Sequence, residues 1–294
     1  MDSVTKNIVL APFNLLYKVN PKFTLELLFR IKQGYKLDLK NPQTYNEKLQ
    51  WIKLYDQNPL MPKCCDKYTV RSYIEKIGCA DILNGLIWEG FNPEDIPFDK
   101  LPKRCVIKVT HGSTFNIICK DIKKLKREEV IQKCKRWLKA KFIPCYGEWF
   151  YGVERPRVIV EEFLDDGSGK GLIDYKVFCF NGKAKIIDVH TGRYSEHKRN
   201  VYDVNWNKRE EVYLKYPHDK WMNKPEVLDQ LIAYAEKISS KFHHARVDFY
   251  IVNNRIYFGE ITFTNGAGFD HIKPYEFDLE MGSYLKLPIK ATDK

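Results

Sequence analysis

Two pairs of strand-like segments, each joined by a tight turn, constrain the fold more than any other feature of this sequence. Residues 174–180 and 183–190 are rich in β-branched and aromatic side chains and are separated by Asn181-Gly182, which is typical of a two-residue hairpin turn. Residues 245–264 divide in the same way at Asn253-Asn254. Helical patterns occur between the strands without regular β-α-β alternation. The sequence therefore predicts an α+β fold with antiparallel sheets.

Amphipathic helices are predicted at several places along the chain. Residues 7–32 contain Pro12 and Pro21, each of which can open a helix but would interrupt one, so two short helices fit this segment. Thr44 and Glu47 have the spacing of a capping box, which predicts the start of a helix. Further helices are expected near 66–74, 123–142 and 225–242.

The N-terminal helices combine apolar side chains with several lysines and arginines. A helical cap packed on the main body has this pattern, and so does a basic amphipathic surface that contacts a membrane. We expect the packed cap and keep peripheral membrane contact as the alternative.

The charge balance indicates an anionic partner. The chain has 49 Lys and Arg residues against 38 Asp and Glu residues, a net charge of +11, which suits nucleic acid, a membrane surface, a nucleotide or an acidic polymer. No apolar run reaches the ~20 residues of a membrane span, and no secretory cleavage site is apparent. The eight cysteines include no C-x-x-C pair, so reduced and mostly buried thiols are expected. Together these features predict a cytoplasmic protein.

The second hairpin carries charged residues on one face. Arg246 and Asp248 alternate with apolar residues and so share a face of their strand. A three-residue loop around Asn253 would set Arg246 opposite Glu260, with Asp248 diagonal to it. A two-residue turn would separate Asp248 from Glu260, so a bulge or an unusual loop is predicted. Two converging carboxylates predict a Mg²⁺ site, and a surface ion pair between Arg246 and Glu260 is the alternative.

A second group of candidates lies near a glycine-containing loop. Lys108 ends the strand-like run 104–109 just before residues 111–114. A lysine beside loop amides can hold nucleotide phosphates, although a lysine that only reaches solvent at a strand end gives the same pattern. Glu161 lies near the end of the strand 157–164 and could turn backbone groups towards an adenine ring.

In combination, these segments resemble the ATP-grasp superfamily, and most closely its TupA-like branch, which is named for teichuronopeptide biosynthesis. Each motif is weak alone, but their order along the chain is specific. The segments that carry the resemblance are 41–56 (NPQTYNEKLQWIKLYD), 66–71 (DKYTVR), 106–120 (VIKVTHGSTFNIICK), 160–164 (VEEFL), 174–183 (DYKVFCFNGK), 197–203 (HKRNVYD) and 246–268 (RVDFYIVNNRIYFGEITFTNGAG).

The resemblance implies a fold in which ATP lies between two antiparallel sheets. One sheet would belong to a small lobe, 61–158, and the other to a large lobe, 159–294, after a helical segment, 1–60. The implied nucleotide-binding residues are Lys67 and Lys108 at the phosphates, Gly112 and Ser113 in a lid over them, Glu161, Glu162, Phe163 and Leu164 along the adenine, and Asp174 or Glu162 near the ribose.

The resemblance also implies a catalytic centre on the second lobe. Lys176, Arg193 and Arg199 would meet the γ-phosphate or the acid substrate, beside Arg246. Mg²⁺ would be bound by Asp248 and Glu260. Thr262 stands where many superfamily members have a metal-binding asparagine, so Asn265 is the candidate third ligand.

Superfamily members of this kind are similar in mechanism: a carboxylate attacks the γ-phosphate of ATP, and an amine then displaces phosphate from the acyl phosphate. The implied reaction joins an amine or amino acid to a hexuronic acid carboxylate, on a nucleotide sugar or a capsule-type glycan, in cell-surface polysaccharide biosynthesis. A glycosyltransferase or an ATP-dependent kinase of the same pathway is the alternative, although no D-x-D motif is present. No nucleic-acid partner is expected, because the aromatic residues mostly occupy core-facing strand positions.

Overall fold

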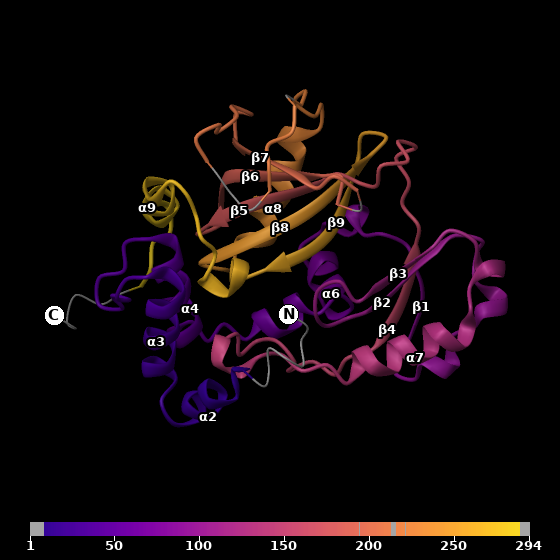
Figure 1. The fold of residues 1–294 in the computed structure, drawn as a ribbon. Coiled ribbons are helices and arrows are strands. Elements are labelled where there is room, and N and C mark those ends of the chain that lie inside the picture. The colour runs from indigo at the N-terminus through magenta and orange to yellow at the C-terminus, as the bar shows by residue number, and fades with distance from the viewer. Residues whose placement is uncertain (1–8, 194, 213–215, 221, 289–294) are drawn as a thin grey trace.

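A computed structural model describes residues 9–193, 195–212, 216–220 and 222–288. The described chain contains two antiparallel sheets, one with four strands and one with five, and helices pack around both (Figure 1). The predicted α+β class with a helical N-terminal segment is therefore confirmed. No helix among these residues is long and apolar enough to cross a membrane.

The two sheets are formed by consecutive parts of the chain. The four-stranded sheet has the order β1-β4-β2-β3 and the five-stranded sheet the order β7-β6-β5-β8-β9. Residues 163–173 connect the two sheets. Strand β4 begins at the predicted lobe boundary, between residues 158 and 159, and pairs only within the first sheet. The strands are β1 (Leu86–Gly90), β2 (Cys105–Val109), β3 (Asn116–Cys119), β4 (Val158–Glu162), β5 (Asp174–Phe180), β6 (Lys183–Thr191), β7 (Lys198–Asp203), β8 (His244–Val252) and β9 (Arg255–Thr262).

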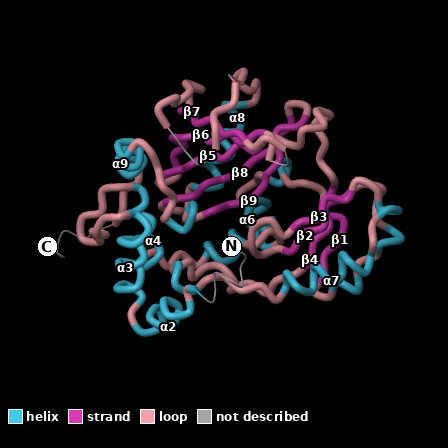
Figure 2. Tube along the Cα trace, in the orientation of Figure 1, coloured by secondary structure: helices cyan, strands magenta, loops and turns pink. Residues whose placement is uncertain are grey.

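Helices cover the edges and faces of these sheets. Figure 2 shows α7 along the four-stranded sheet and α4 and α9 beside the five-stranded sheet. The predicted N-terminal pair is confirmed as α2 and α3, and the predicted capping box of Thr44 and Glu47 is present at the start of α4. The helices are α2 (Ala11–Val19), α3 (Pro21–Gln33), α4 (Tyr45–Tyr55), α5 (Leu60–Cys65), α6 (Thr69–Lys76), α7 (Arg127–Leu138), α8 (Leu228–Ser239) and α9 (Tyr275–Tyr284).

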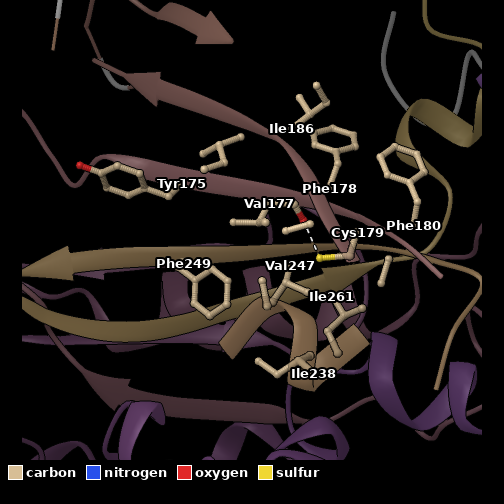
Figure 3. Packing of buried hydrophobic residues seen from close by; sticks show 14 of the residues in the cluster. Tyr175, Val177, Phe178, Cys179, Phe180, Ile186, Ile238, Val247, Phe249 and Ile261 are labelled. Atoms are coloured by element: carbon tan, nitrogen blue, oxygen red, sulfur yellow. Dashed lines mark hydrogen bonds between the residues drawn. The ribbon is translucent and has the colours of Figure 1, made fainter. Parts of the chain in front are cut away.

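Strand alternation divides the five-stranded sheet into two different faces. Val247, Phe249 and Ile261 lie on the same side as Ile238 of α8, whereas Phe178 points to the opposite side (Figure 3). The first face belongs to the largest apolar core, which also includes residues of α4, α5 and α6. The other face is apolar at Phe178, Ile186 and Val201, and it carries charged side chains elsewhere on its central strands.

The β8–β9 hairpin has the predicted bulge but not the predicted pairing. The turn contains only Asn253 and Asn254, and the register shifts so that Asp248 pairs with Glu260. Arg246 pairs with Thr262, and the prediction that Arg246 lies opposite Glu260 is wrong. The residue left unpaired is Gly259, where an added Cβ atom would lie 2.9 Å from the Asp248 carbonyl oxygen. A side chain would not fit there, so this glycine permits the two carboxylates to pair.

All eight cysteines are free thiols, as expected, and only Cys65 is partly exposed. Burial raises the pKa of Cys64 to about 12 and that of Cys134 to about 11. These thiols are therefore packing residues and not nucleophiles.

His244 should couple stability to pH. Its Nδ1 donates to the Phe263 carbonyl at 2.7 Å, and its Nε2 accepts from the Tyr45 hydroxyl at 3.1 Å. Burial lowers the pKa of His244 to about 4. The unfolded chain therefore binds a proton near pH 6.5 that the folded protein excludes. Stability should fall as pH decreases from 6.5 towards 4, by about 3 kcal/mol in total.

Urea unfolding of the wild type and of His244→Gln tests this coupling. Between about pH 7 and pH 5, the wild type should lose ~2 kcal/mol more than the variant. The comparison between proteins is needed because burial raises the pKa of Asp278 to about 6, which changes stability in the opposite direction. Equal pH dependence in the two proteins would contradict the assignment.

Candidate active site

Charged residues form a row across the five-stranded sheet. Lys176 of β5 pairs with Asp188 of β6 on one side and with Asp248 of β8 on the other, and Asp248 pairs with Glu260 of β9. Directly paired residues share a face, so the four side chains lie on the face opposite α8. Asp188 and Asp248 are each only 2% exposed. Burying such charges is unfavourable, and a cluster of this kind is typical of a functional site.

Arg246 and Lys176 compensate the charge of Asp248. Arg246 Nε donates to Asp248 Oδ1 at 2.7 Å, and a second guanidinium nitrogen donates to Oδ2 at 2.8 Å. Lys176 forms a further short ion pair with the same carboxylate. Burial acts to raise the pKa of Asp248, but the two cations outweigh it and lower the pKa below its usual range. Asp248 is therefore ionised throughout the neutral pH range.

The three predicted metal ligands meet at one guanidinium group. Arg246 contacts Glu260 at 3.3 Å and also forms a hydrogen bond to the side-chain oxygen of Asn265. Among the described residues, no cluster of three or more His, Cys, Asp or Glu side chains has the geometry of a metal site. Two carboxylates and an amide oxygen nevertheless form the hard donor set that Mg²⁺ prefers. The Glu260 side chain is 38% exposed, so its carboxylate is more accessible than that of Asp248.

A cleft between the two sheets contains the predicted phosphate lysines. It is lined by Lys67, Lys108 and Glu161 on one side and by Phe258 and Gly259 of β9 on the other. Lys67 Nζ lies 3.8 Å from Glu260 Oε2, so the cleft opens next to the charged row. The structure thus brings residues from before β1, from β2, from β4 and from β9 into one site.

Glu161 and two basic residues form a network inside this cleft. Lys108 Nζ is 2.5 Å from Glu161 Oε2, and an Arg71 nitrogen is 3.6 Å from Glu161 Oε1. Arg71 also donates to the Asn84 carbonyl at 2.9 Å. Lys67, Arg71 and Lys108 face only one carboxylate from the four-stranded sheet, so this side of the cleft has a net positive charge and suits phosphate groups.

The loop that contains Gly112 and Ser113 is attached to Lys67. The Lys67 ammonium donates to the Gly112 carbonyl oxygen at 2.7 Å. Gly112 has a φ of 77°, and an added Cβ atom would lie 2.8 Å from the Phe115 ring. Ser113 is exposed at the tip. The loop therefore adjoins the cleft through Lys67, which also connects it to the charged row.

The predicted adenine residues are less closely grouped. Only Glu161 of the four lines the cleft. Glu162 is exposed, and the Phe163 ring lies 5.0 Å from the Arg104 guanidinium. Leu164 is partly buried in the segment that leaves the sheet.

A second polar network extends the charged row towards β7. Arg199 donates from two nitrogens to the two carboxylate oxygens of Asp188, each at 2.6 Å. His190 Nε2 lies 3.0 Å from Asp188 Oδ2, and His190 Nδ1 lies 2.8 Å from His197 Nε2. Burial acts to raise the pKa of Asp188, but Arg199 and His190 hold it far below its usual range. Asp188 is thus an obligate acceptor, which fixes the hydrogen-bond direction along the chain of rings.

Asp174, at the start of β5, is paired in register with His190 of β6. Its Oδ2 accepts a short hydrogen bond from Arg193, and Lys176 Nζ lies 3.7 Å away. Asp174 Oδ1 is buried without a hydrogen-bond partner within the described ranges. A buried carboxylate oxygen of this kind is costly unless a ligand or water satisfies it.

Sequence reasoning missed three members of the site: Arg71, Asp188 and His190. The alternation within 183–191 held the signal for two of them, because Ile187 and Val189 require one face and leave Asp188 and His190 on the other. Arg71 had no comparable signal, since its role depends on α6 lying beside β4.

Comparison with known proteins identifies the family. A profile of TupA-like ATP-grasp proteins matches residues 47–286, most of the chain. The chain belongs to the TupA-like ATP-grasp family. The resemblance inferred from the segment order is thereby confirmed, and the family is a branch of the ATP-grasp superfamily. The search of curated proteins found no match.

Solved structures show a remote likeness. A D-alanine–D-alanine ligase from Bacillus anthracis in complex with ATP is 15% identical, with a TM-score of 0.40, over 68% of this chain and 54% of that one. An L-amino acid ligase from Bacillus licheniformis is 15% identical, with a TM-score of 0.47, over 86% and 57%. A D-alanine–D-alanine ligase from Helicobacter pylori is 14% identical, with a TM-score of 0.45, over 84% and 71%. The chain thus spans little more than half the length of the first two.

Proposed function

We propose that the protein is an ATP-dependent carboxylate–amine ligase that forms an amide through an acyl phosphate. The observation that carries this proposal is the buried charged row of the five-stranded sheet, which adjoins a basic cleft beneath the four-stranded sheet. Lys67 lies between the two features, 3.8 Å from Glu260. Transferring the γ-phosphoryl group of a nucleoside triphosphate to a carboxylate, with ADP as the leaving group, requires two anions to approach each other, and this arrangement supplies positive charge from both sides.

The nucleotide would lie in the cleft. Lys67 and Lys108 would hold its phosphates beneath the loop of Gly112 and Ser113. Residues 161–164 would border the adenine at the edge of the first sheet, with Asp174 or Glu162 near the ribose. The lobes 61–158 and 159–294 would enclose ATP, and the helical segment 1–60 would support the second lobe.

Mg²⁺ suits the oxygen donors of Asp248, Glu260 and Asn265. When bound there, it would neutralise phosphate charge during transfer. Arg246 holds all three side chains in one region through its guanidinium contacts. The bulge at Gly259 keeps Glu260 directly opposite Asp248. This chain therefore presents the oxygen donors together before any ion binds.

The reacting carboxylate would lie between the phosphates and the basic groups of the second sheet. Each of these basic groups forms an ion pair with a carboxylate on the face of the second sheet opposite α8. The pairs are Lys176 with Asp248, Arg193 with Asp174 and Arg199 with Asp188. These carboxylates fix the position of the cations, so the cations are preorganised for the charge that develops on transfer.

The amine must lose a proton when it attacks the acyl phosphate, and His197 would accept that proton. Because the Asp188 carboxylate can only accept a hydrogen bond, His190 donates to it from Nε2. The other ring nitrogen of His190, Nδ1, then accepts a hydrogen bond from His197 Nε2. This leaves His197 Nδ1 as the basic atom. Proton uptake there would pass the positive charge to His190, beside Asp188. Burial, His190 and Arg193 lower the pKa of His197, which keeps it unprotonated at neutral pH.

His197→Gln should slow amide formation with an ordinary primary amine by about 100-fold near neutral pH. Hydroxylamine is far less basic, so after attack its nitrogen is acidic enough to lose its proton to water, and its reaction with the acyl phosphate should be nearly unchanged. His271→Gln, at an exposed site, is the matched control. Equal losses with both nucleophiles would show that His197 has only a structural role.

For the substrates, the proposal is an acidic sugar carboxylate and an amine or amino acid. A hexuronic acid on a nucleotide sugar or capsular glycan suits the net charge of +11 and the family's link to cell-surface polymers. The proposed location is the cytoplasm, and the proposed pathway is polysaccharide biosynthesis. A glycosyltransferase or a kinase of the same pathway is the alternative.

Thermal unfolding with nucleotides tests the proposal. Mg·ATP, Mg·ADP and UDP-sugars, including UDP-glucuronic acid, are added at concentrations up to about 100 Kd, where a bound ligand stabilises the fold by ~2.7 kcal/mol. A shift with adenine nucleotides that requires Mg²⁺ supports the ligase and permits an ADP-release screen of amines against uronic acids. A shift with UDP-sugars alone would favour the glycosyltransferase. ADP release without an amine, with a stable phosphorylated product, would favour the kinase.

A further inference from the structure

Exposed apolar side chains concentrate at the N-terminal helices. Of the ten large apolar residues that are exposed in the described chain, five lie between residues 9 and 31. Four of these belong to α2 and α3: Leu15 (68% exposed), Val19 (79%), Phe23 (49%) and Ile31 (61%). Scattered exposed apolar residues are ordinary, but half of them within one short segment indicate an interaction surface.

The exposure follows from the helical period and not from poor packing. Phe23 and Ile31 are eight residues apart on α3 and lie on one side, with Leu27 between them. Leu25, Leu28 and Phe29 occupy the opposite side and are buried in a core that includes Ala267 and Phe269. Helix α3 is therefore apolar on two sides, and only one side has a partner in the described structure.

Basic residues accompany the exposed apolar ones. Lys18, Lys22 and Arg30 are exposed, and none forms an ion pair within the described ranges. Residues 9–33 contain four basic residues and one acidic residue, Glu26. Figure 1 shows α2 and α3 at an edge of the molecule, away from the four-stranded sheet. A positively charged apolar surface would repel a second copy of itself and complements an anionic one.

We propose that this α2–α3 surface, formed by Leu15, Val19, Phe23 and Ile31 with Lys18, Lys22 and Arg30, docks the enzyme on an anionic lipid bilayer. The apolar side chains enter the interface between headgroups and acyl chains, and the basic side chains contact the lipid phosphates. The buried side of α3 packs on Ala267 and Phe269, close to Asn265, so docking places the catalytic lobe directly above the membrane. Docking through this surface requires no substrate and does not depend on the proposed ligase reaction.

Vesicle co-sedimentation of the full chain tests the proposal. Binding is measured with vesicles of phosphatidylcholine alone and with vesicles containing about one third phosphatidylglycerol. The wild type should bind the anionic vesicles and should be released by high salt. Leu15→Ser with Phe23→Ser should weaken the partition coefficient by about 100-fold, since two apolar contacts are lost. Lys18→Gln with Lys22→Gln should weaken it by at least about tenfold.

Two controls make changes of the same kind elsewhere. Val153→Ser removes an apolar side chain that is 60% exposed, and Lys123→Gln with Lys124→Gln removes two exposed charges. Neither should change vesicle binding, and thermal unfolding checks that every variant is folded. Equal binding to neutral vesicles, or equal losses in the controls, would overturn the proposal. So would an absence of vesicle binding together with a dimer, seen by sedimentation, that Leu15→Ser with Phe23→Ser dissociates.

Discussion

Replacing Glu260 with Gln should reduce ATP consumption by about 10³-fold or more while the protein remains folded. The proposed ion neutralises charge that develops in the transition state and so stabilises it by several kcal/mol. An amide binds such an ion much more weakly than a carboxylate does. Stability should change little, because the Glu260 side chain is 38% exposed and its contacts to Arg246 and Lys67 are long, at 3.3 and 3.8 Å. ADP release and thermal unfolding measure the two effects separately.

Glu276→Gln provides the matched control for this prediction. Glu276 is an exposed carboxylate on α9 outside the cleft, so the change in charge is identical. Its ADP release should equal that of the wild type. Wild-type turnover by Glu260→Gln would refute the metal assignment, and a similar loss in both variants would point to a general effect of net charge.

Asp248→Asn should instead destabilise the fold by about 3–5 kcal/mol. Asp248 is buried and accepts from both Arg246 and Lys176. An amide would therefore remove the closest anion of two buried cations and leave only the longer contacts to Glu260 and Asp174. Urea unfolding at neutral pH measures the difference. Arg246 and Lys176 keep the folded-state pKa of Asp248 below its usual value, so its stabilising effect is complete above that value and is lost as pH falls through the folded pKa.

The double variant Asp248→Asn with Lys176→Met separates the two causes. Removing one cation should recover part of the lost stability, because the methionine side chain has no charge to bury. Lys176→Met alone should also destabilise the wild type. If the double variant is as unstable as the sum of the single changes, the ion pair does not couple the two residues as the structure indicates.

Local sequence signals predicted the secondary structure well where a turn or a cap has strict chemical requirements. Asn181-Gly182 and Asn253-Asn254 form the two hairpin turns, with positive φ angles at all four residues. Thr44 and Glu47 form the capping box. By contrast, β1, β7, α5 and α9 were not predicted, because short strands and helices of this kind depend on their neighbours and not on a strong local pattern.

The candidate site was predicted in its chemistry but not in its contacts. Asp248, Glu260 and Lys108 were selected from their positions on strands, and Lys176 from the family resemblance. Lys108 lines the cleft, whereas the other three belong to the charged row of the second sheet. A bulge was predicted, but the sequence did not indicate which of the two strands would contain the unpaired residue. The pairing of Asp248 with Glu260 depends on the close approach of Gly259 to a backbone carbonyl, which no local rule specifies.

The sequence by itself determined the fold class, the family resemblance and the residue types of the site. These depend on local periodicity, on turn residues and on the order of segments, all of which can be read along one chain. Only the tertiary structure decided that Lys67 reaches Glu260, that Arg71 joins Glu161 and that Asp188 connects Arg199 to two histidines. Except for the contact between Asp188 and His190 within β6, these contacts join separate segments of the chain, so they depend on strand order and sheet packing, which a linear pattern does not contain.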